Sequence, residues 1–429
     1  MCVDDKKDVV AIIGLGYVGL PLAVLFSKKY DVIGFDIDST KVDKYKQGID
    51  VTGEFKETEL QKCGILFTDD ENYLDNSNFK IISVPTPILE DNSPDLNYIR
   101  SASSLVSKHI NKGDFIIYES TVYPGVTEDI CLPILENGSN LKCFDDFYVG
   151  YSPERVSPGD KGKSIENITK IVSACDEFSL ERISNLYNSV LKQGIYKAKS
   201  IKIAEAAKIT ENIQRDVNIA LMNELSIIFN KLDINTMDVI EAASTKWNFN
   251  KYTPGLVGGH CIGVDPYYLI YKSNNLNYTP KLIETSRNIN EHLVDHIIKN
   301  IMYTLVKEKI QILESDILVC GITFKENCND IRNSKIVDVI NELKNIGINV
   351  EIYDPIANTD EVQKVYGFDL ITNLDKQYDA IVMAVSHDVF DDYSVDTFKS
   401  LSKKAPILFD LKSQFAYLNN NNDIVYWSL

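Results

Sequence analysis

The sequence lacks the cysteine and histidine spacings that build disulfide frameworks or zinc sites. None of its eight cysteines pairs with another across two intervening residues, and only five histidines occur in 429 residues. This distribution predicts reduced thiols, a cytoplasmic protein and no bound metal.

Basic residues are outnumbered by acidic ones. Lysine and arginine total 44 against 62 aspartates and glutamates, which gives a formal net charge of −18. Such a chain is repelled by phosphate backbones, so we expect no nucleic-acid partner. An anionic ligand would have to be held by a few local basic groups.

Membrane signals are also scarce. Residues 9–26 carry no charge, but they include three glycines, and the segment before them has more acidic than basic residues. A signal peptide opens with a basic region, and a spanning helix is normally longer. We therefore expect a buried strand, a turn and a buried helix here, with no membrane partner.

Apolar, strand-like runs alternate with helical patterns in the first third of the chain. Polar and proline-rich turns follow several of these runs. The expected strands are residues 9–13, 31–35, 80–84, 114–120 and 147–152. This alternation predicts a doubly wound parallel sheet that binds its ligand at the carboxyl ends of the strands.

Residues 201–232 contain no glycine or proline and repeat apolar residues every three or four positions, which predicts one helix of roughly 45 Å. After residue 310 the strand–helix alternation resumes. The predicted fold class is α/β, with two Rossmann-like doubly wound parallel-sheet domains joined by a long central helix and a helical middle domain. The expected domains are residues 1–200, 201–310 and 311–429.

A glycine-rich turn follows the first expected strand. Gly14-x-Gly16-x-x-Gly19 precedes a helix, and the next strand ends in Asp36 at the spacing of an acid that binds ribose hydroxyls. The first glycine allows a tight turn, the second a close approach of the pyrophosphate, and the third close packing of helix on strand. The pattern predicts a dinucleotide site; a turn without a ligand is the structural alternative.

Asp36 favours NAD, because a carboxylate repels the 2′-phosphate of NADP. Lys41 and Lys44 leave NADP open, since either could accept that phosphate.

A second constellation lies in the middle of the chain. Lys208 and Asn212 share one face of the expected long helix, where an amine and a carboxamide can stabilise an oxyanion or pass on a proton. Cys261 follows two glycines and a histidine in 258-GGHCIGVDPYY-268. The structural alternatives are a solvated helix face and an inert buried thiol.

Six segments together resemble one enzyme family. They are 14-GLGYVGLPLA-23, 119-ESTVYPG-125, 151-YSPERVSPGD-160, 205-EAAKITEN-212, 258-GGHCIGVDPYY-268 and 321-GITFKENCNDIRNS-334. The family is that of the UDP-glucose/GDP-mannose dehydrogenases, and the resemblance covers nearly the whole chain. The branch it resembles acts on UDP-N-acetylhexosamines, since Val264 stands where the UDP-glucose branch usually has lysine.

The resemblance implies oxidation of the sugar C6 alcohol to a carboxylate by NAD in two steps. Cys261 would form a thiohemiacetal and then a thioester. Lys208 and Asn212 would hold the oxyanion and a water, and Asp265 would join in proton transfer. Thr121 and Glu154 would position or activate the water.

The resemblance also implies binding residues. The cofactor positions are Gly14, Gly16, Tyr17, Val18, Gly19, Asp36, Lys41, Thr86, Thr121 and Arg332. The substrate positions are Arg155, Lys208, Asn212, Tyr252, Gly258, Phe324 and Lys325. His387 is interpreted as structural.

Other readings remain open at this point. The chain could be a UDP-glucose 6-dehydrogenase, a two-electron NAD-dependent dehydrogenase that needs no thiol, or a catalytically silent sensor. We expect a homodimer through the long helix and a role in surface or capsular polysaccharide synthesis. The sequence does not decide between gluco and galacto sugars.

Overall fold

The computed structural model describes residues 8–53, 55, 57–155, 165–259, 262–419 and 421–429. Two compact units divide the chain. The first runs to Glu211 and includes Tyr267–Tyr278; the second comprises Asn212–Pro266 and Thr279–Leu429. Both units contribute residues to the central helices.

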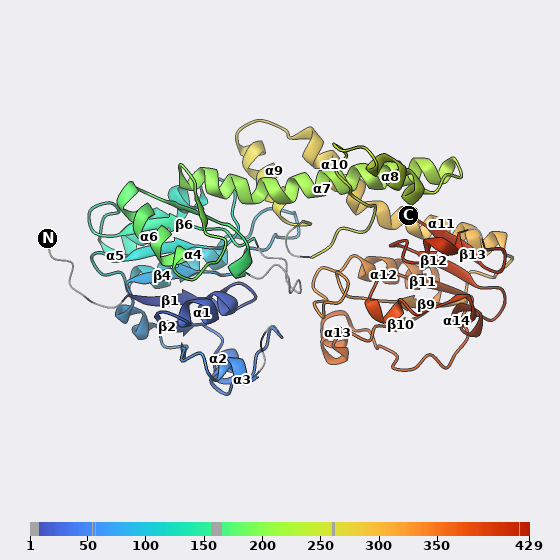
Figure 1. Ribbon diagram of the computed structural model, residues 1–429, viewed down its shortest axis with the longest axis horizontal. Coiled ribbons are helices and arrows are strands. Elements are labelled where there is room, and N and C mark those ends of the chain that lie inside the picture. Colours follow the sequence, from blue (N-terminus) through green and yellow to red (C-terminus); the bar gives the residue numbers. More distant parts are fainter. Residues whose placement is uncertain (1–7, 54, 56, 156–164, 260–261, 420) are drawn as a thin grey trace. The chain divides into compact units, whose positions relative to one another are not determined.

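The first unit contains an eight-stranded sheet with the order β3-β2-β1-β4-β5-β6-β7-β8 (Figure 1). Its first six strands run parallel, while β7 is antiparallel to β6. The strands are β1 (Val9–Ile13), β2 (Asp31–Phe35), β3 (Leu66–Thr68), β4 (Phe79–Ile82), β5 (Phe115–Tyr118), β6 (Tyr148–Tyr151), β7 (Lys170–Ala174) and β8 (Ile195–Lys197). Strand order reverses between β1 and β4, where doubly wound sheets bind ligands.

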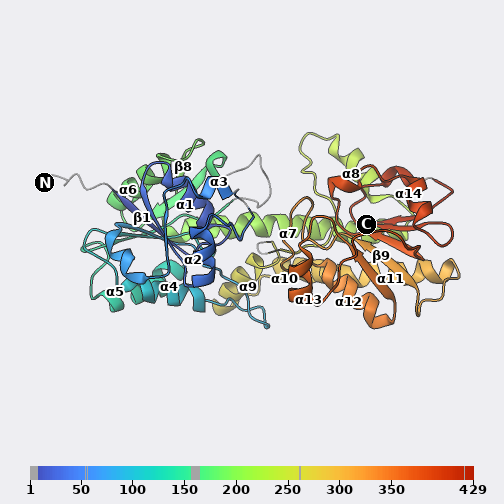
Figure 2. The same ribbon diagram turned by 90° about the horizontal axis from the view of Figure 1, so that it is seen from below.

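Helices cover both faces of this sheet, which explains why its strands are apolar runs without alternation. Helices α1 and α6 pack on one face and share a core with β1, β4 and β5; α4 and α5 lie on the other face (Figure 2). The helices are α1 (Gly19–Ser27), α2 (Ser39–Lys46), α3 (Glu57–Leu60), η1 (Glu71–Asn76), α4 (Asn97–Ser107), η2 (Thr127–Cys131), α5 (Leu132–Ser139), η3 (Ile165–Asn167) and α6 (Glu177–Asn188).

The predicted long helix is confirmed as α7 (Ile201–Lys231), 31 residues without a break. The central helices that follow are α8 (Thr236–Ser244), α9 (Asp265–Asn275), α10 (Lys281–Glu291) and α11 (Leu293–Lys307). The side chain of Asn235 caps α8 by accepting from the Asp238 N–H at 3.0 Å. Among the described helices, none is long and apolar enough to cross a bilayer.

The second unit contains a five-stranded parallel sheet with the order β10-β9-β11-β12-β13. The strands are β9 (Asp316–Cys320), β10 (Asn349–Tyr353), β11 (Ala380–Met383), β12 (Ile407–Asp410) and β13 (Val425–Ser428). Its helices are α12 (Ile336–Ile346), α13 (Thr359–Tyr366), η4 (Asp388–Phe390), α14 (Val395–Ser400) and η5 (Ala416–Leu418). Helices α11 and α12 share a core with one face, and α14 packs on the other.

The two sheets repeat the same turn after their first strand. Gly14 and Gly321 have φ values of +92° and +93°, and each donates its N–H at 2.9 Å to the last residue of the neighbouring strand. In both sheets an aspartate after the second strand accepts from the turn: Asp36 from the Leu15 N–H at 2.8 Å, and Asp354 from the Ile322 N–H at 2.7 Å. The two-Rossmann prediction is therefore confirmed at the level of individual hydrogen bonds.

Candidate active site

The glycine turn after β1 has the shape that a dinucleotide pyrophosphate needs. A Cβ on Gly14 would lie 2.9 Å from the Ser83 carbonyl oxygen, and one on Gly19 would lie 1.8 Å from the Gly14 oxygen. A Cβ on Gly16 would meet nothing within 4 Å, so open space lies above this backbone. At the start of α1, Val18 makes no side-chain capping bond, which leaves backbone N–H groups for an anion.

Asp36 lies at the end of β2, beside this turn. Its Oδ2 accepts from Leu15 N–H and Lys41 Nζ, both at 2.8 Å, and its Oδ1 accepts from Asp38 N–H at 3.0 Å. The Lys41 charge is thus paired with Asp36 rather than presented to a 2′-phosphate. The residues fit NAD.

Thr86 lies in the loop after β4, and a tyrosine absent from the predicted site fixes that loop. The hydroxyl of Tyr268, a fully buried residue of α9, donates to the carbonyls of Thr86 at 2.9 Å and Pro87 at 3.2 Å. Tyr17, in the glycine turn, is half-buried like Thr86.

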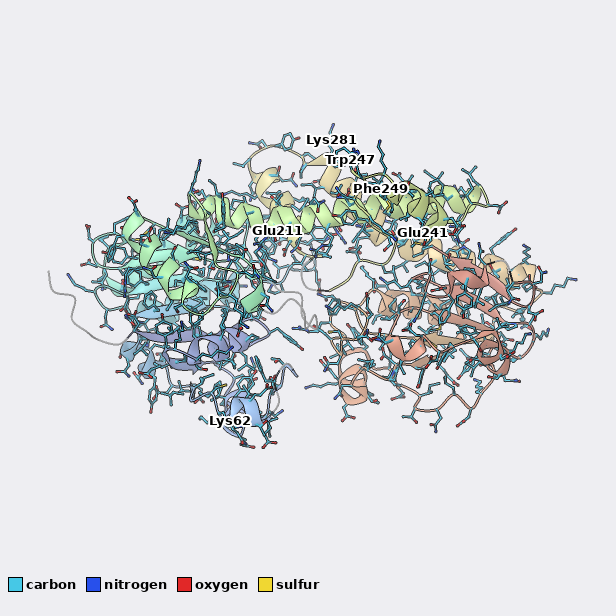
Figure 3. The ribbon with its side chains drawn as sticks, viewed as in Figure 1. Lys62, Glu211, Glu241, Trp247, Phe249 and Lys281 are labelled. Carbon is cyan, nitrogen blue, oxygen red and sulfur yellow. The ribbon has the colours of Figure 1, made fainter. Side chains whose placement is uncertain are left out.

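Thr121 and Glu154 follow β5 and β6 at the carboxyl edge of the sheet, and both are half-buried. The Arg155 N–H donates to Glu154 Oε1 at 2.6 Å. The Arg155 guanidinium forms an ion pair with Glu211 of α7, through Nε at 3.1 Å and Nη2 at 2.6 Å. Its Nη1 donates to the Thr169 carbonyl. Arg155 therefore joins the loop after β6 to α7 (Figure 3 labels Glu211); its contact with a substrate stays a prediction.

Lys208 and Asn212 lie four residues apart on α7 and are only 7% and 4% exposed, so the alternative of a solvated helix face is wrong. Asn212 donates its amide to Asp265 Oδ2 at 2.5 Å. Asp265 is buried at the first position of α9, where the helix dipole favours a carboxylate. Cys261 lies outside the described residues.

The loop before Cys261 packs on the second unit's own sheet. A Cβ on Gly258 would lie 2.5 Å from the Asn333 carbonyl oxygen, and one on Gly259 would lie 2.9 Å from the Phe324 ring. A narrow cavity within this unit is lined by Gly258, Phe324, Lys325 and nine further residues. The other lining residues are Leu256, Thr323, Ser334, Lys335, Ile336, Ala384, Val385, Leu411 and Lys412.

Arg332 and Tyr252 have partners on the protein. Arg332 makes a two-pronged ion pair with Asp330, with Nε–Oδ1 at 2.9 Å and Nη2–Oδ2 at 2.7 Å. Tyr252 donates its hydroxyl to Gln214 of α7 at 3.0 Å. The geometry gives each a local anchor, and their ligand contacts stay predictions.

One buried carboxylate near these loops was not predicted from the sequence. Glu205 of α7 is fully buried and accepts from the N–H groups of Gly125 at 2.6 Å and Thr127 at 3.0 Å. Burial raises its pKa to about 7, and the two backbone hydrogen bonds oppose the rise. It ties the loop of Thr121 to the helix of Lys208. Sequence spacing cannot show such a contact, because its partners are about 80 residues apart.

Taken together, the glycine turn, Asp36 and the doubly wound sheet define a dinucleotide-binding site of the kind that NAD-dependent dehydrogenases use. Comparison with known proteins narrows the class. The UDP-glucose/GDP-mannose dehydrogenase family matches in three parts: its NAD binding domain at residues 8–191, its central domain at 202–292 and its UDP binding domain at 318–416.

Relatives that match along nearly their whole length support the same family assignment. Protein CapL of Staphylococcus aureus is 47% identical, over 94% of this chain and 95% of its own. UDP-N-acetyl-D-glucosamine 6-dehydrogenase of Salmonella typhi is 46% identical, over 96% of both chains. The solved UDP-D-ManNAc dehydrogenase of Pyrococcus horikoshii has a TM-score of 0.88 at 32% identity, covering 98% of each chain. The chain belongs to the UDP-glucose/GDP-mannose dehydrogenase family and is an NAD-dependent nucleotide-sugar dehydrogenase.

Proposed function

We propose that the protein oxidises C6 of UDP-N-acetyl-D-glucosamine to the carboxylate of the corresponding uronic acid. The observation that carries this proposal is the 46% identity to the Salmonella typhi UDP-N-acetyl-D-glucosamine 6-dehydrogenase along nearly the whole of both chains. UDP-N-acetyl-D-galactosamine is the second candidate within the same class. The product would feed surface or capsular polysaccharide synthesis.

The second of the two oxidations needs a nucleophile that first adds to the aldehyde, since a free aldehyde donates hydride poorly. The Cys261 thiolate would add to the aldehyde carbon, and the resulting oxyanion would take a proton to give a thiohemiacetal. Loss of a hydride and a proton from this adduct leaves a thioester. Water then breaks the C–S bond, which releases the carboxylate and returns the thiol.

The buried Lys208 and Asn212 side chains of α7 would stabilise the negative charge that develops on oxygen in these steps. Lys208 and the Asn212 amide would donate to the oxyanion in a site shielded from water, where such bonds are strong. Asp265 orients the Asn212 amide and would take part in proton transfer. Thr121 and Glu154 would position and activate the water that cleaves the thioester.

We assign cofactor binding to residues 1–200. The turn Gly14–Gly19, with Tyr17 and Val18, would hold the pyrophosphate; Asp36 and Lys41 would hold the adenosine ribose. Thr86, Thr121 and Arg332 would complete the set. When bound, NAD⁺ supplies the hydride acceptor for both oxidations.

We assign nucleotide-sugar binding to residues 311–429, and the thiol loop and dimer helix to residues 201–310. Phe324, Lys325 and Gly258 line the cavity of the second unit, where the lysine would meet a phosphate or sugar hydroxyl. Tyr252 and Arg155 would complete the substrate contacts.

The proposal is tested by stoichiometry on three sugars. With UDP-N-acetyl-D-glucosamine, UDP-N-acetyl-D-galactosamine and UDP-glucose supplied separately, we expect about two NADH per sugar and the highest kcat/KM for the first. Formation of one NADH with accumulating aldehyde would reject the thioester scheme. In a two-electron dehydrogenase or a silent sensor, Cys261→Ala would change nothing; here it should abolish the second oxidation.

A further inference from the structure

A buried ion pair lies behind the residues assigned to water activation. Glu119 directly follows β5 and is 1% exposed; Lys170 opens β7 and is 4% exposed. The ammonium donates to Glu119 Oε2 at 2.6 Å, and the buried Tyr187 hydroxyl of α6 donates to the other carboxylate oxygen. Two positions beyond Glu119 the chain reaches Thr121.

Lys170 reaches this edge of the sheet because β7 runs antiparallel to β6. Its first residue therefore lies beside the carboxyl end of β6, and the ammonium donates to the Pro153 carbonyl at 3.1 Å and, more weakly, to the Ser152 carbonyl at 3.5 Å. The residue after Pro153 is Glu154. Lys170 thus fixes the backbone immediately before the candidate carboxylate.

The other side of Glu154 is held as well, since Arg155 is clamped by Glu211 and by the Thr169 carbonyl. Thr169 directly precedes Lys170, so the contact to Arg155 and the contact to the Pro153 carbonyl come from one short segment. Glu154 has few ways to shift its backbone while these bonds persist.

Glu119, Lys170 and Glu154 also interact electrostatically. Burial raises the pKa of Glu119 to about 7, the Lys170 ammonium lowers it, and the nearby charge of Glu154 raises it. The two carboxylates are therefore close enough to repel each other, and Lys170 offsets that repulsion. Removing the ammonium would leave two unbalanced acids at the edge where Glu154 lies.

A second buried ion pair in the same sheet provides a comparison. Lys80 of β4 is fully buried and donates to Asp114 at 2.7 Å and to the Ser77 carbonyl at 2.7 Å. Asp114 precedes β5 and Glu119 follows it, so the two pairs mark opposite ends of one strand. None of the predicted site residues that the structure describes lies at the Lys80 end. The pairs have the same chemistry and different neighbours.

We propose that Glu119, Lys170 and Tyr187 are positioning residues that hold Glu154 in place for water activation, with Lys170 as the link between the buried carboxylate and the Pro153 carbonyl. This role rests on the function proposed above for Glu154. Lys170 would not touch substrate; it would act through the backbone and the charge of its neighbours.

The experiment is a double-mutant cycle on the full-length enzyme, with Lys170→Met, Glu154→Gln and the double variant. Lys170→Met should lower kcat roughly ten- to hundredfold and leave the KM for each substrate within about twofold, because a displaced group affects the reacting geometry more than ground-state binding. In the Glu154→Gln background, the same change should alter kcat by less than about twofold.

Lys80→Met is the matched control. It also breaks a buried pair, so it should lower the thermal midpoint, but kcat should stay unchanged. Should Lys170→Met fail to fold, Tyr187→Phe removes only one hydrogen bond to Glu119 and should show the same dependence on Glu154 with a smaller factor.

The outcomes separate the two claims. If Glu154→Gln keeps full kcat, the role proposed for Glu154 is wrong, and the positioning role is rejected with it. If Glu154→Gln lowers kcat but Lys170→Met costs the same factor in both backgrounds, only the positioning role is overturned.

Discussion

His387 holds the loop on which Phe324 and Lys325 lie. It is fully buried, and its Nδ1 accepts from the Asn327 N–H at 3.0 Å. That bond places the ring proton on Nε2, which lies 3.3 Å from an Asp354 carboxylate oxygen. Burial acts to raise the pKa of Asp354, but hydrogen bonds from His387 and the backbone bring it below its ordinary value. The sequence-based interpretation of His387 as structural agrees with these contacts.

We expect His387→Ala to raise the KM for the UDP-sugar about tenfold, which corresponds to roughly 1.4 kcal/mol of lost binding. The loop that carries Phe324 and Lys325 would lose its anchor at Asn327, while all the proposed NAD-binding residues except Arg332 lie in the other unit. His387→Asn can keep a hydrogen-bond acceptor near the position of Nδ1. Its KM for the UDP-sugar should therefore lie between those of the parent enzyme and His387→Ala. Steady-state kinetics with each substrate varied gives the answer; an equal rise in the KM for NAD⁺ would count against the loop-anchor role.

At the level of elements, Glu205 ties α7 to the loop before η2. Its pKa of about 7 in the folded protein stands above the ordinary value of 4.5, so the folded state binds an extra proton between these values. Its contribution to stability is complete below about pH 4.5 and is lost as pH rises through 7. The change could reach about 3 kcal/mol.

We therefore expect the thermal midpoint of the parent enzyme to fall, relative to that of Glu205→Gln, as the pH is raised from 5 to 8. Glu136→Gln is the control, because hydrogen bonds from Lys142 and the backbone hold the Glu136 pKa below its ordinary value and it stays ionised in this window. Scanning calorimetry across the range tests this; parallel curves for the parent and Glu205→Gln would contradict it.

Local patterns predicted the elements that depend on nearby residues. The β1 strand, the glycine turn and α7 follow from apolar runs, glycine spacing and helical periodicity. The sequence did not indicate β3 and β8, which have three residues each, or β13, which follows an asparagine-rich turn. Nor did it indicate β7 or its reversed direction, because strand direction is decided by distant partners.

The same limit applies to the candidate site. Gly14 and Asp36 could be predicted because their spacing is fixed within one strand–helix–strand unit. The helical pattern alone does not show that Lys208 is buried. The contact between Asn212 and Asp265 joins residues 53 positions apart. Glu119 and Lys170 are 51 residues apart and carry no motif of their own. A lone glutamate or lysine becomes informative only when the fold brings the two together.

At the scale of the whole molecule, we propose a homodimer formed through α7. Ile203, Leu221 and Ile228 are 46–49% exposed, and Leu232, just after the helix, is 60% exposed. Their separations of 18, 7 and 4 residues place them on one stripe of a helix with 3.6 residues per turn. Trp247, which extends from the loop after α8, is 92% exposed (Figure 3). A row of apolar side chains on a long helix is costly to leave in water, and a second copy can cover it with the same row.

Leu221→Asp should shift the protein toward monomer, because a carboxylate would have to be buried in the self-complementary surface. The side chain is half exposed in the single chain, so the fold itself should tolerate the change. Val365→Asp, on α13 and 52% exposed, is the matched control and should leave the mass unchanged. Sedimentation velocity over a concentration series measures the oligomeric state of both variants and of the parent protein. A monomeric parent protein would reject the dimer, whereas a dimer that survives Leu221→Asp would move its interface away from this stripe.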